Sequence, residues 1–390
     1  MLGSAAVVGV GESVYYKAGR APDTVEQLAS TAIRNAVADA GLEMADIDGV
    51  VTYNTPLDSA GLKAANMASW LGFGDLKFAA NPTSGGGNLG AATVAMADAA
   101  VSSGYARNVV VYRALAQGTK RYGLVHGPNL VGGEAAYRTP YGLGAPVAFN
   151  AVLAMKYMHD HSISQDALAE IALASYAHAQ QNPRAVMYGK PLSREVYHAS
   201  RWIAEPFHLF DCCQENDGAC AIVVTSGEHA RDLPNTPAYI RAAASGMQPK
   251  GGYWAFNDDA FPSGRYATIG RDLWNRAGVR PEDIDVAQFY ENFTGTTLMA
   301  IADMGFCRPE ELEAFVSDGR LRAPDGGLPI NTSGGNLAEA YIHGLQLINE
   351  AVRQIRGESV NQVPDVELSL SVAGPGTPPG SAVLFSRSAA

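Results

Sequence analysis

The sequence predicts an α/β protein built from two similar halves, arranged as five alternating layers of helix and sheet (αβαβα). Three kinds of segment occur once in each half and in the same order. A chain of 390 residues is long enough for such a unit, and segments that recur in this way indicate an internal duplication. The matching pairs are residues 40–48 with 277–285, 86–89 with 334–337, and 217–224 with 380–385.

Each half is expected to contain the same elements. An amphipathic helix ends at a glycine, and a loop then leads to a strand. An Ala-rich helix follows, beginning at Gly87 or Gly335. Since this helix is short of charged residues, we expect it to lie buried between two mostly parallel sheets. The predicted amphipathic helices are residues 25–40 and 269–277, and the strands after them are residues 49–53 and 286–290.

The first half carries a long insertion, because its last matching segment lies much farther from the others than in the second half. We place the insertion at about residues 114–206, around helices at 146–159 and 165–180. Long insertions in compact cores usually have a function, such as a lid or a substrate loop. The predicted domains are therefore an N-terminal half, 1–235, that includes this loop domain, and a C-terminal half, 236–390.

Composition excludes several classes of function. The net charge is -11 and the basic residues are spread thinly, so no basic stripe for nucleic acid is present. Two of the four cysteines are adjacent, which suits neither a disulfide nor a zinc site, so we expect a reducing compartment and no metal in this chain. The N-terminal segment lacks a basic region, and no run of about 18 apolar residues occurs. We expect a soluble, cytoplasmic protein.

Two motifs of the second half resemble the thiolase superfamily. Residues 331–344, NTSGGNLAEAYIHG, resemble the signature in which Asn-x-x-Gly-Gly is followed by Gly-His-Pro, and Tyr341 stands where thiolases carry the catalytic histidine. Residues 288–293, QFYENF, resemble the Asn-Glu-Ala-Phe motif, with Tyr290 at the position of the asparagine. The resemblance covers essentially the whole chain and implies the thiolase fold, specifically that of the sterol-carrier-protein-type homologues once described as lipid-transfer proteins.

The thiols of thiolases are missing from the matching positions. Gly87 falls where the nucleophilic cysteine should stand, and residues 372–377, VAGPGT, resemble the C-terminal catalytic loop without its cysteine. Acyl transfer by this fold needs a thiolate to take the acyl group. Ordinary thiolysis and Claisen condensation are therefore excluded by the resemblance.

A subgroup that departs from thiolases at the same positions is the steroid side-chain-cleaving aldolases, which also carry tyrosines there. Residues 201–206 and 211–215 resemble that subgroup too. The resemblance implies a retro-aldolase that cleaves a β-hydroxyacyl-CoA, such as a 17-hydroxy steroid CoA, to propionyl-CoA and a 17-ketosteroid. It further implies a homodimer that binds a small partner with an OB-fold and a zinc ribbon, forming a heterotetramer. No cofactor is expected in this chain; CoA enters as part of the substrate, and zinc only in the partner.

The resemblance also assigns roles to single residues. A retro-aldol reaction needs an acid/base group and an enolate clamp. An ordinary tyrosine has a pKa of about 10, so a basic phenolate needs help from its surroundings. The assigned residues are Tyr290 and Tyr341 as the acid/base pair, His343 to polarise or orient Tyr341, and the backbone N–H groups of Gly376 and Gly87 for the enolate. Apart from the resemblance, Tyr253 and Trp254 belong to an aromatic stretch suited to covering a flat polycyclic substrate, and Asn331 is a further candidate for substrate binding.

Two alternatives remain open at this point. An acyltransferase with a nucleophile other than cysteine would need Ser84 or Ser333 to become acylated. A non-catalytic subunit that binds an acyl-CoA or a lipid would bind ligand normally, but its function would not depend on Tyr341.

Overall fold

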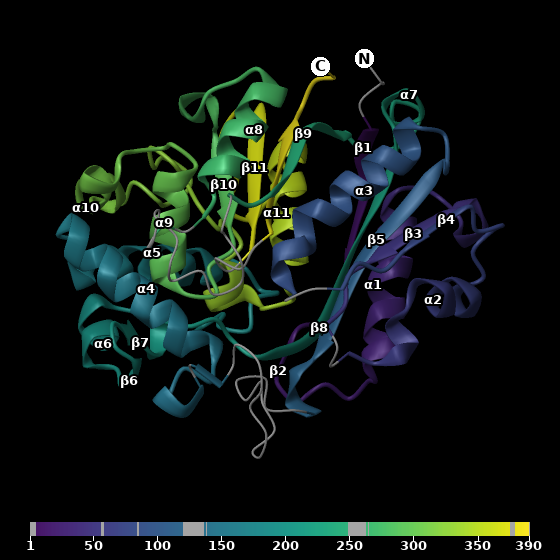
Figure 1. Cartoon of the computed structure of the whole chain (residues 1–390). Coiled ribbons are helices and arrows are strands. Elements are labelled where there is room, and N and C mark those ends of the chain that lie inside the picture. The colour runs from purple at the N-terminus through teal and green to yellow at the C-terminus, as the bar shows by residue number, and fades with distance from the viewer. Residues whose placement is uncertain are drawn as a thin grey trace.

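A single mixed sheet forms the centre of the computed structural model (Figure 1). The structure describes residues 5–55, 58–83, 86–119, 136–137, 139–248, 263, 265–374 and 379–389. Along the sheet the strand order is β10-β11-β12-β9-β1-β8-β5-β3-β4, and β2 pairs with β8. The strands are β1 (Ala5–Glu12), β2 (Tyr16–Lys17), β3 (Gly49–Thr52), β4 (Phe78–Ala80), β5 (Asn108–Ala116), β8 (Asn216–Ser226), β9 (Ala238–Gly246), β10 (Val286–Phe289), β11 (Leu368–Ala373) and β12 (Gly380–Ser386).

The strand order repeats between the two halves. In the first half β1, β8, β5 and β3 are neighbours, and in the second half β9, β12, β11 and β10 take the same places. The directions also repeat, since the first three strands of each set alternate and the last runs parallel to its neighbour. Two pairs of residues between β1 and β9 join the halves into one sheet. The duplication seen in the sequence is therefore present in the topology, although the boundary at residue 235 stays a prediction.

The expectation of mostly parallel sheets is wrong. Only the pairs β3–β4, β3–β5 and β10–β11 run parallel among the described strands. The reason is visible at β12, which follows β11 after a short connection, and neighbouring strands joined in this way run antiparallel. β8 takes the equivalent place beside β5, although the long insertion precedes it.

Helices cover both outer faces and fill the space between the two halves of the sheet. α1 (Val25–Asp39) packs on β1, β5 and β8, and α8 (Ala267–Ala277) packs on β9 and β12. Between them lie α3 (Gly90–Ser102) and α11 (Leu345–Arg356), which contact strands of both halves. The five layers predicted from the sequence are confirmed.

The second buried helix differs from its prediction in two ways. It begins at Leu345 and not at Gly335, because residues Gly335–Glu339 form a π-helical turn and the chain then bends at His343 and Gly344, whose φ angles are 51° and 85°. It is also not poor in charge, since it contains the buried Glu350 and the largely buried Arg353, whose side chain is 11% exposed. The bend between the π-helical turn and α11 carries part of the site described below.

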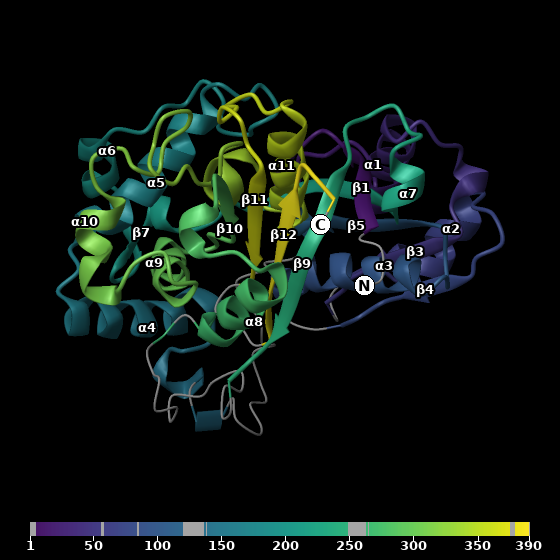
Figure 2. The ribbon, with the colours of Figure 1, turned by 90° about the horizontal axis from the view of Figure 1, so that it is seen from above.

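The insertion lies between β5 and β8 and packs against the second half of the protein. Its helices α4 (Pro146–His161) and α5 (Gln165–Ala179) contact α9 (Thr294–Asp303). Seen from above, the second half lies between the insertion and the strands of the first half (Figure 2). The remaining α-helices and strands of the described residues are α2 (Ala64–Leu71), α6 (Arg194–Ala199), β6 (Trp202–Ala204), β7 (Phe207–His208), α7 (Gly227–Ala230) and α10 (Leu312–Val316).

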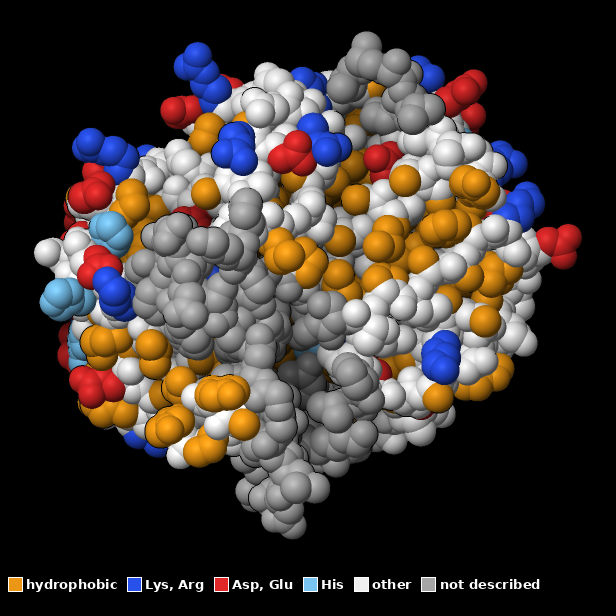
Figure 3. All heavy atoms as spheres, viewed as in Figure 1, with side chains coloured by type: hydrophobic (Ala, Val, Ile, Leu, Met, Phe, Trp, Pro, Cys, Tyr) orange, Lys and Arg blue, Asp and Glu red, His pale blue; other side chains and the backbone are white. Residues whose placement is uncertain are grey.

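One surface feature of the insertion is apolar. On the face shown in Figure 3, hydrophobic side chains gather over α4, where Val152 and Met155 are each 41% exposed. A groove of about 710 Å³ runs along this part of α4 toward Ala204 and Glu205. Within the described residues, no helix is both long enough and apolar enough to cross a membrane.

Candidate active site

Tyr290 and Tyr341 meet in the interior, although they are 51 positions apart in the sequence. Tyr290 follows the end of β10, and Tyr341 lies in the bend between the π-helical turn and α11. The hydroxyl of Tyr290 donates a hydrogen bond to the hydroxyl oxygen of Tyr341 at 2.8 Å. Their rings lie 5.9 Å apart at 70°, and the two side chains are almost completely buried. The structure thus brings together the two tyrosines singled out in the sequence.

Glycines make room for Tyr290. A Cβ atom added at Gly87 would lie 2.1 Å from Cζ and from the hydroxyl oxygen of Tyr290. One added at Gly344 would lie 2.7 Å from Cδ2 of the same ring. The tyrosine ring therefore occupies the volume into which any side chain at position 87 would project, so Gly87 and Tyr290 depend on each other. Gly87 begins the 3₁₀ turn that leads into α3, close to the positive end of that helix.

His343 lies beside the tyrosine pair and is held by an arginine. Its ring stands edge-on to that of Tyr341, with 5.3 Å between the centroids. Arg113 donates to its Nδ1 from Nε at 3.2 Å and from Nη2 at 2.9 Å. Burial and the charge of Arg113 hold the pKa of His343 well below its usual range. The backbone oxygen of His343 accepts a hydrogen bond from the hydroxyl of Tyr53 at 2.8 Å.

Sequence analysis missed Arg113. It is completely buried in β5, where its guanidinium forms a bidentate pair with Asp58, with N–O distances of 2.8 and 3.2 Å. A signal for it exists in the sequence, because Arg113 directly follows the apolar run Val109–Tyr112 inside a strand. An arginine in that position is rarely buried without a partner.

A cavity of about 190 Å³ opens onto Tyr341. Most of its wall is apolar and comes from the insertion and from the start of α9. Cys212 and Cys213 contribute to it, but burial raises the pKa of the Cys212 thiol to about 12 and that of Cys213 well above its usual value. Neither thiol is therefore activated as a nucleophile. The lining residues are Gln117, Ala145, Pro146, Val147, Ile203, Cys212, Cys213, Gln214, Glu215, Asn292, Phe293 and Tyr341.

Asn331 lies behind β10, where its side chain supports the backbone. Its Oδ1 accepts a hydrogen bond from the N–H of Phe289 at 2.8 Å, and the residue is completely buried with a φ of 50°. The role in substrate binding stays a prediction for this residue. Next to it, burial raises the pKa of Glu291 to about 8. A Cβ atom added at Gly335 would lie 1.6 Å from Oε1 of Glu291, so this glycine makes room for the carboxyl group.

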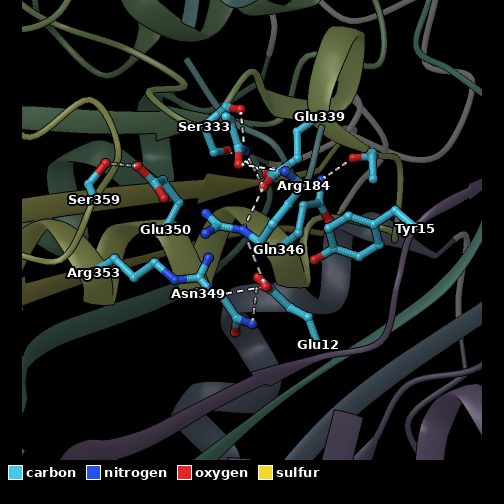
Figure 4. Close-up of polar contacts among 12 residues, drawn as sticks. Glu12, Tyr15, Arg184, Ser333, Glu339, Gln346, Asn349, Glu350, Arg353 and Ser359 are labelled. Carbon is cyan, nitrogen blue, oxygen red and sulfur yellow. Dashed lines mark hydrogen bonds and ion pairs between the residues drawn. The ribbon is translucent and has the colours of Figure 1, made fainter. Parts of the chain in front are cut away.

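A second, largely buried polar group surrounds Glu339, two positions before Tyr341 (Figure 4). We call Glu12, Arg184, Glu339 and Arg353 the ion cluster. Glu12 is 2.8 Å from Arg353 and 3.6 Å from Arg184, and Arg184 is 3.8 Å from Glu339. Burial alone would raise the pKa of Glu12, but Arg353 and Arg184 lower it below its usual range. The ion cluster joins β1, the insertion, the π-helical turn and α11.

Ser333 belongs to this second group. It is completely buried, and its hydroxyl donates to Oε2 of Glu339 at 2.5 Å. Burial raises the pKa of Glu339 to about 7. The lining of the cavity at Tyr341 includes neither Ser333 nor Glu339. This arrangement gives no support to an acyl-enzyme at Ser333.

Several residues singled out in the sequence lie outside the described part of the chain: Ser84, Tyr253, Trp254 and Gly376. Among the residues that the structure does describe, no group of three or more His, Cys, Asp or Glu side chains comes together in a way that could hold a metal ion.

Comparison with known proteins shows the family of this chain. The family model described as "Thiolase C-terminal domain-like" matches residues 258–384. The 17-hydroxy-3-oxo-4-pregnene-20-carboxyl-CoA lyase of Mycobacterium tuberculosis is 41% identical over 98% of this chain and 99% of its own length. The steroid side-chain-cleaving aldolase of Thermomonospora curvata is 40% identical over 98% of each chain.

A solved structure agrees as well. The Ltp2-ChsH2(DUF35) aldolase superposes with a TM-score of 0.90 at 38% identity, covering 98% of this chain and 97% of that one. This chain belongs to the thiolase superfamily, in its branch of sterol-carrier-protein-type homologues that includes the steroid side-chain-cleaving aldolases.

Proposed function

We propose that this chain is a retro-aldolase that cleaves the side chain of a steroid CoA thioester by tyrosine acid/base catalysis. The observation that carries the proposal is the buried Tyr290–Tyr341 hydrogen bond at the cavity, with Gly87 in place of a nucleophile. The family supports it independently, because relatives that match almost the whole chain are a carbon–carbon lyase and an aldolase, both acting on steroids.

The reaction needs only proton transfers. A base takes the proton of the β-hydroxyl group. The hydroxyl oxygen then forms a carbonyl with Cβ, and the bond between Cβ and Cα breaks. The electron pair moves into the thioester, giving an enolate, which is then protonated at Cα. The products are a ketone and a shortened acyl-CoA. No cofactor is required in this scheme.

Tyr341 is the better candidate for contact with the substrate, because it lines the cavity and Tyr290 lies behind it against Gly87. A hydrogen bond donated by Tyr290 favours negative charge on the Tyr341 oxygen, as a base requires. The same pair can return the proton to the enolate carbon. For the enolate oxygen we assign the backbone N–H of Gly87, at the N-terminal end of the α3 segment, together with Gly376.

The substrate follows from the relatives and the cavity. The lyase of M. tuberculosis carries a 17-hydroxy-3-oxo-4-pregnene-20-carboxyl-CoA in its name. By analogy we propose a 17-hydroxy steroid with a three-carbon acyl-CoA side chain, giving propionyl-CoA and a 17-ketosteroid. The cavity of about 190 Å³ is smaller than the 300–1,000 Å³ typical of sites for whole drug-sized ligands. We therefore place the reacting side chain, and not the ring system, at Tyr341, with Tyr253 and Trp254 as candidates for ring contacts.

We further propose that the chain is a homodimer that assembles with a small DUF35-type partner into a heterotetramer in the cytoplasm. The Ltp2-ChsH2(DUF35) aldolase is the similar assembly that supports this. The apolar surface over α4, with Val152 and Met155, is a candidate contact, since exposed apolar patches often mark interfaces. Zinc is expected in the partner's ribbon.

The test is release of propionyl-CoA from a 17-hydroxy steroid CoA thioester by the chain copurified with its partner. Wild type is compared with Tyr290→Phe, Tyr341→Phe and the control Tyr105→Phe, whose side chain is 67% exposed. We expect the first two to lose roughly 10²- to 10⁴-fold in kcat, the usual contribution of general acid–base catalysis, and the control to match wild type.

Three other outcomes would contradict the proposal. If wild type binds the CoA ester without cleaving it, the chain is an accessory binding subunit. If both variants cleave at the wild-type rate while their thermal unfolding is unchanged, the tyrosines are not the acid/base pair. Detection of an acylated serine by mass spectrometry would favour the acyltransferase instead.

A further inference from the structure

We propose that Arg113 is a positioning residue that holds His343 as the tautomer with its proton on Nε2, so that His343 can donate a hydrogen bond beside Tyr341 but cannot accept a proton. The inference deepens the proposed function and rests on it for its catalytic meaning. The tautomer itself can be measured without any turnover.

The contact with Arg113 fixes which nitrogen carries the hydrogen. Nε and Nη2 of the guanidinium lie 3.2 and 2.9 Å from Nδ1 of His343. An arginine side chain has only donors and stays charged, so Nδ1 must offer its lone pair. In a neutral imidazole the hydrogen is then on Nε2.

The surroundings keep the ring neutral and in place. Arg113 contacts the ring at Nδ1, Tyr53 contacts the backbone oxygen of His343, and the ring of Tyr341 stands edge-on to the imidazole, while Asp58 is paired with Arg113. Protonation would put a second hydrogen on Nδ1, against the guanidinium. A Cβ atom added at Gly86 would lie 2.7 Å from Cε1 of His343, so the imidazole is packed directly against that glycine. Turning the ring over would exchange Nδ1 for a carbon at Arg113 and forfeit the hydrogen bonds.

This arrangement separates the roles in the site. A histidine that can only donate stabilises negative charge, either on the phenolic oxygen of Tyr341 or on the thioester oxygen of a bound substrate. The proton of the substrate hydroxyl must therefore go to the tyrosine pair. Arg113 acts through His343, and it is not among the residues that line the cavity.

The first experiment is ¹⁵N NMR of the histidine side chains in the full chain with its partner, with His343→Gln to assign the signal. We expect protonated Nε2 and unprotonated Nδ1, unchanged from pH 8 down to about pH 5.5, below the ordinary histidine pKa of about 6.5. A proton on Nδ1, or titration of His343 near 6.5, would overturn the proposal whatever the activity of the enzyme.

The second experiment removes the arginine together with its carboxylate, since Arg113→Met alone would leave Asp58 without its ion pair and could unfold the protein. In Asp58→Asn/Arg113→Met we expect the pKa of His343 to rise but to stay below its ordinary value, because burial, the larger cause of its depression, remains. Because outer-shell partners usually contribute roughly 10- to 100-fold, we expect kcat to fall by that factor with little change in KM, and the pH–rate profile to gain an acid limb. The matched control is Asp272→Asn/Arg276→Met, an exposed ion pair on α8.

The outcomes separate the two proposals. A folded double variant with the wild-type tautomer, pH profile and kcat would contradict the role of Arg113. If wild type cleaves no steroid CoA, the proposed function fails, while the NMR result still decides whether Arg113 fixes His343. Arg113→Lys retains one charged nitrogen that can donate to Nδ1. We expect it to keep the tautomer and to recover part of the kcat lost in the double variant.

Discussion

Two largely buried polar groups lie next to the bend at Ala340–Gly344: the ion cluster, and the tyrosine site formed by Tyr290, Tyr341 and His343. The polar atoms of the ion cluster face one another, whereas the tyrosine site faces a cavity. In the ion cluster, each carboxylate lies near an arginine, and none of the four side chains lines the cavity at Tyr341. In the tyrosine site, Tyr341 opens onto that cavity, and the nearby charge of Arg113 is directed at His343 and Asp58.

This difference suggests how to tell structure from chemistry among buried charges. Ionic groups that neutralise each other hold chain segments in place. Here they hold β1, the insertion and α11 around Glu339, which lies two positions before Tyr341. Polar groups that face a cavity can interact with a ligand. Variants of the ion cluster should therefore act on stability, and variants of the tyrosine site on turnover.

The largest effect on stability is expected for Arg353→Met. It leaves Glu12 buried without its nearest cation, and breaking a buried ion pair in this way costs about 3–5 kcal/mol of unfolding free energy. The matched variant Glu12→Gln/Arg353→Met removes both charges and should recover most of the loss. Urea unfolding followed by circular dichroism measures both. Equal stability of Arg353→Met and wild type would mean that the ion cluster does not stabilise the fold, and the distinction from the tyrosine site would be lost.

A smaller loss of stability but a clear loss of turnover is expected for Gly87→Ala. The added methyl group would lie 2.1 Å from the Tyr290 ring, and overpacking of this kind costs about 1–3 kcal/mol. Displacing Tyr290 by about 1 Å should lower kcat roughly 100-fold. The control Gly246→Ala adds its methyl group where no atom lies within 4 Å. Full activity of Gly87→Ala would mean that turnover does not depend on the position of the Tyr290 ring.

The pH dependence of stability tests whether Glu291, a buried carboxyl group beside the tyrosine site, is protonated in the folded protein. Its folded pKa, about 8, lies above the ordinary 4.5 because of burial. Between these values the unfolded chain binds fewer protons than the folded one, so stability falls as pH rises, by at most about 1.4 kcal/mol per pH unit for one group. Glu291→Gln should flatten this slope between pH 6 and 8 in urea titrations. Glu339, with a raised pKa of about 7, keeps its own contribution in the variant. Superimposable slopes would show that Glu291 is ionised in the fold.

The smallest effect is expected at the surface. Arg276→Met breaks an ion pair with Asp272 whose side chains are 61% and 44% exposed. Exposed pairs contribute about 0–1 kcal/mol, and salt weakens them further. The same urea titration at low and high salt sets the baseline against which the buried arginines are judged. A loss as large as that in Arg353→Met would mean that burial does not decide the effect.

The sequence by itself determined the repeated order of elements, and its resemblance to thiolases pointed to the candidate site residues. Matching segments in each half predicted the layers, and the motif positions singled out Tyr290, Tyr341 and His343 and showed the missing thiols. These features are local, since they depend on the spacing of neighbouring residues and on the presence or absence of a cysteine. For this reason they could be obtained without a structure.

Only the tertiary structure decided the contacts between distant residues and the directions of the strands. Arg113 and His343 are 230 positions apart, and they meet only where the fold brings β5 and the bend before α11 together. The start of α11 also depended on packing, since the π-helical turn and the positive φ angles at His343 and Gly344 are held by buried partners. Local propensity cannot specify such contacts, because their free energy arises only when both segments have folded together.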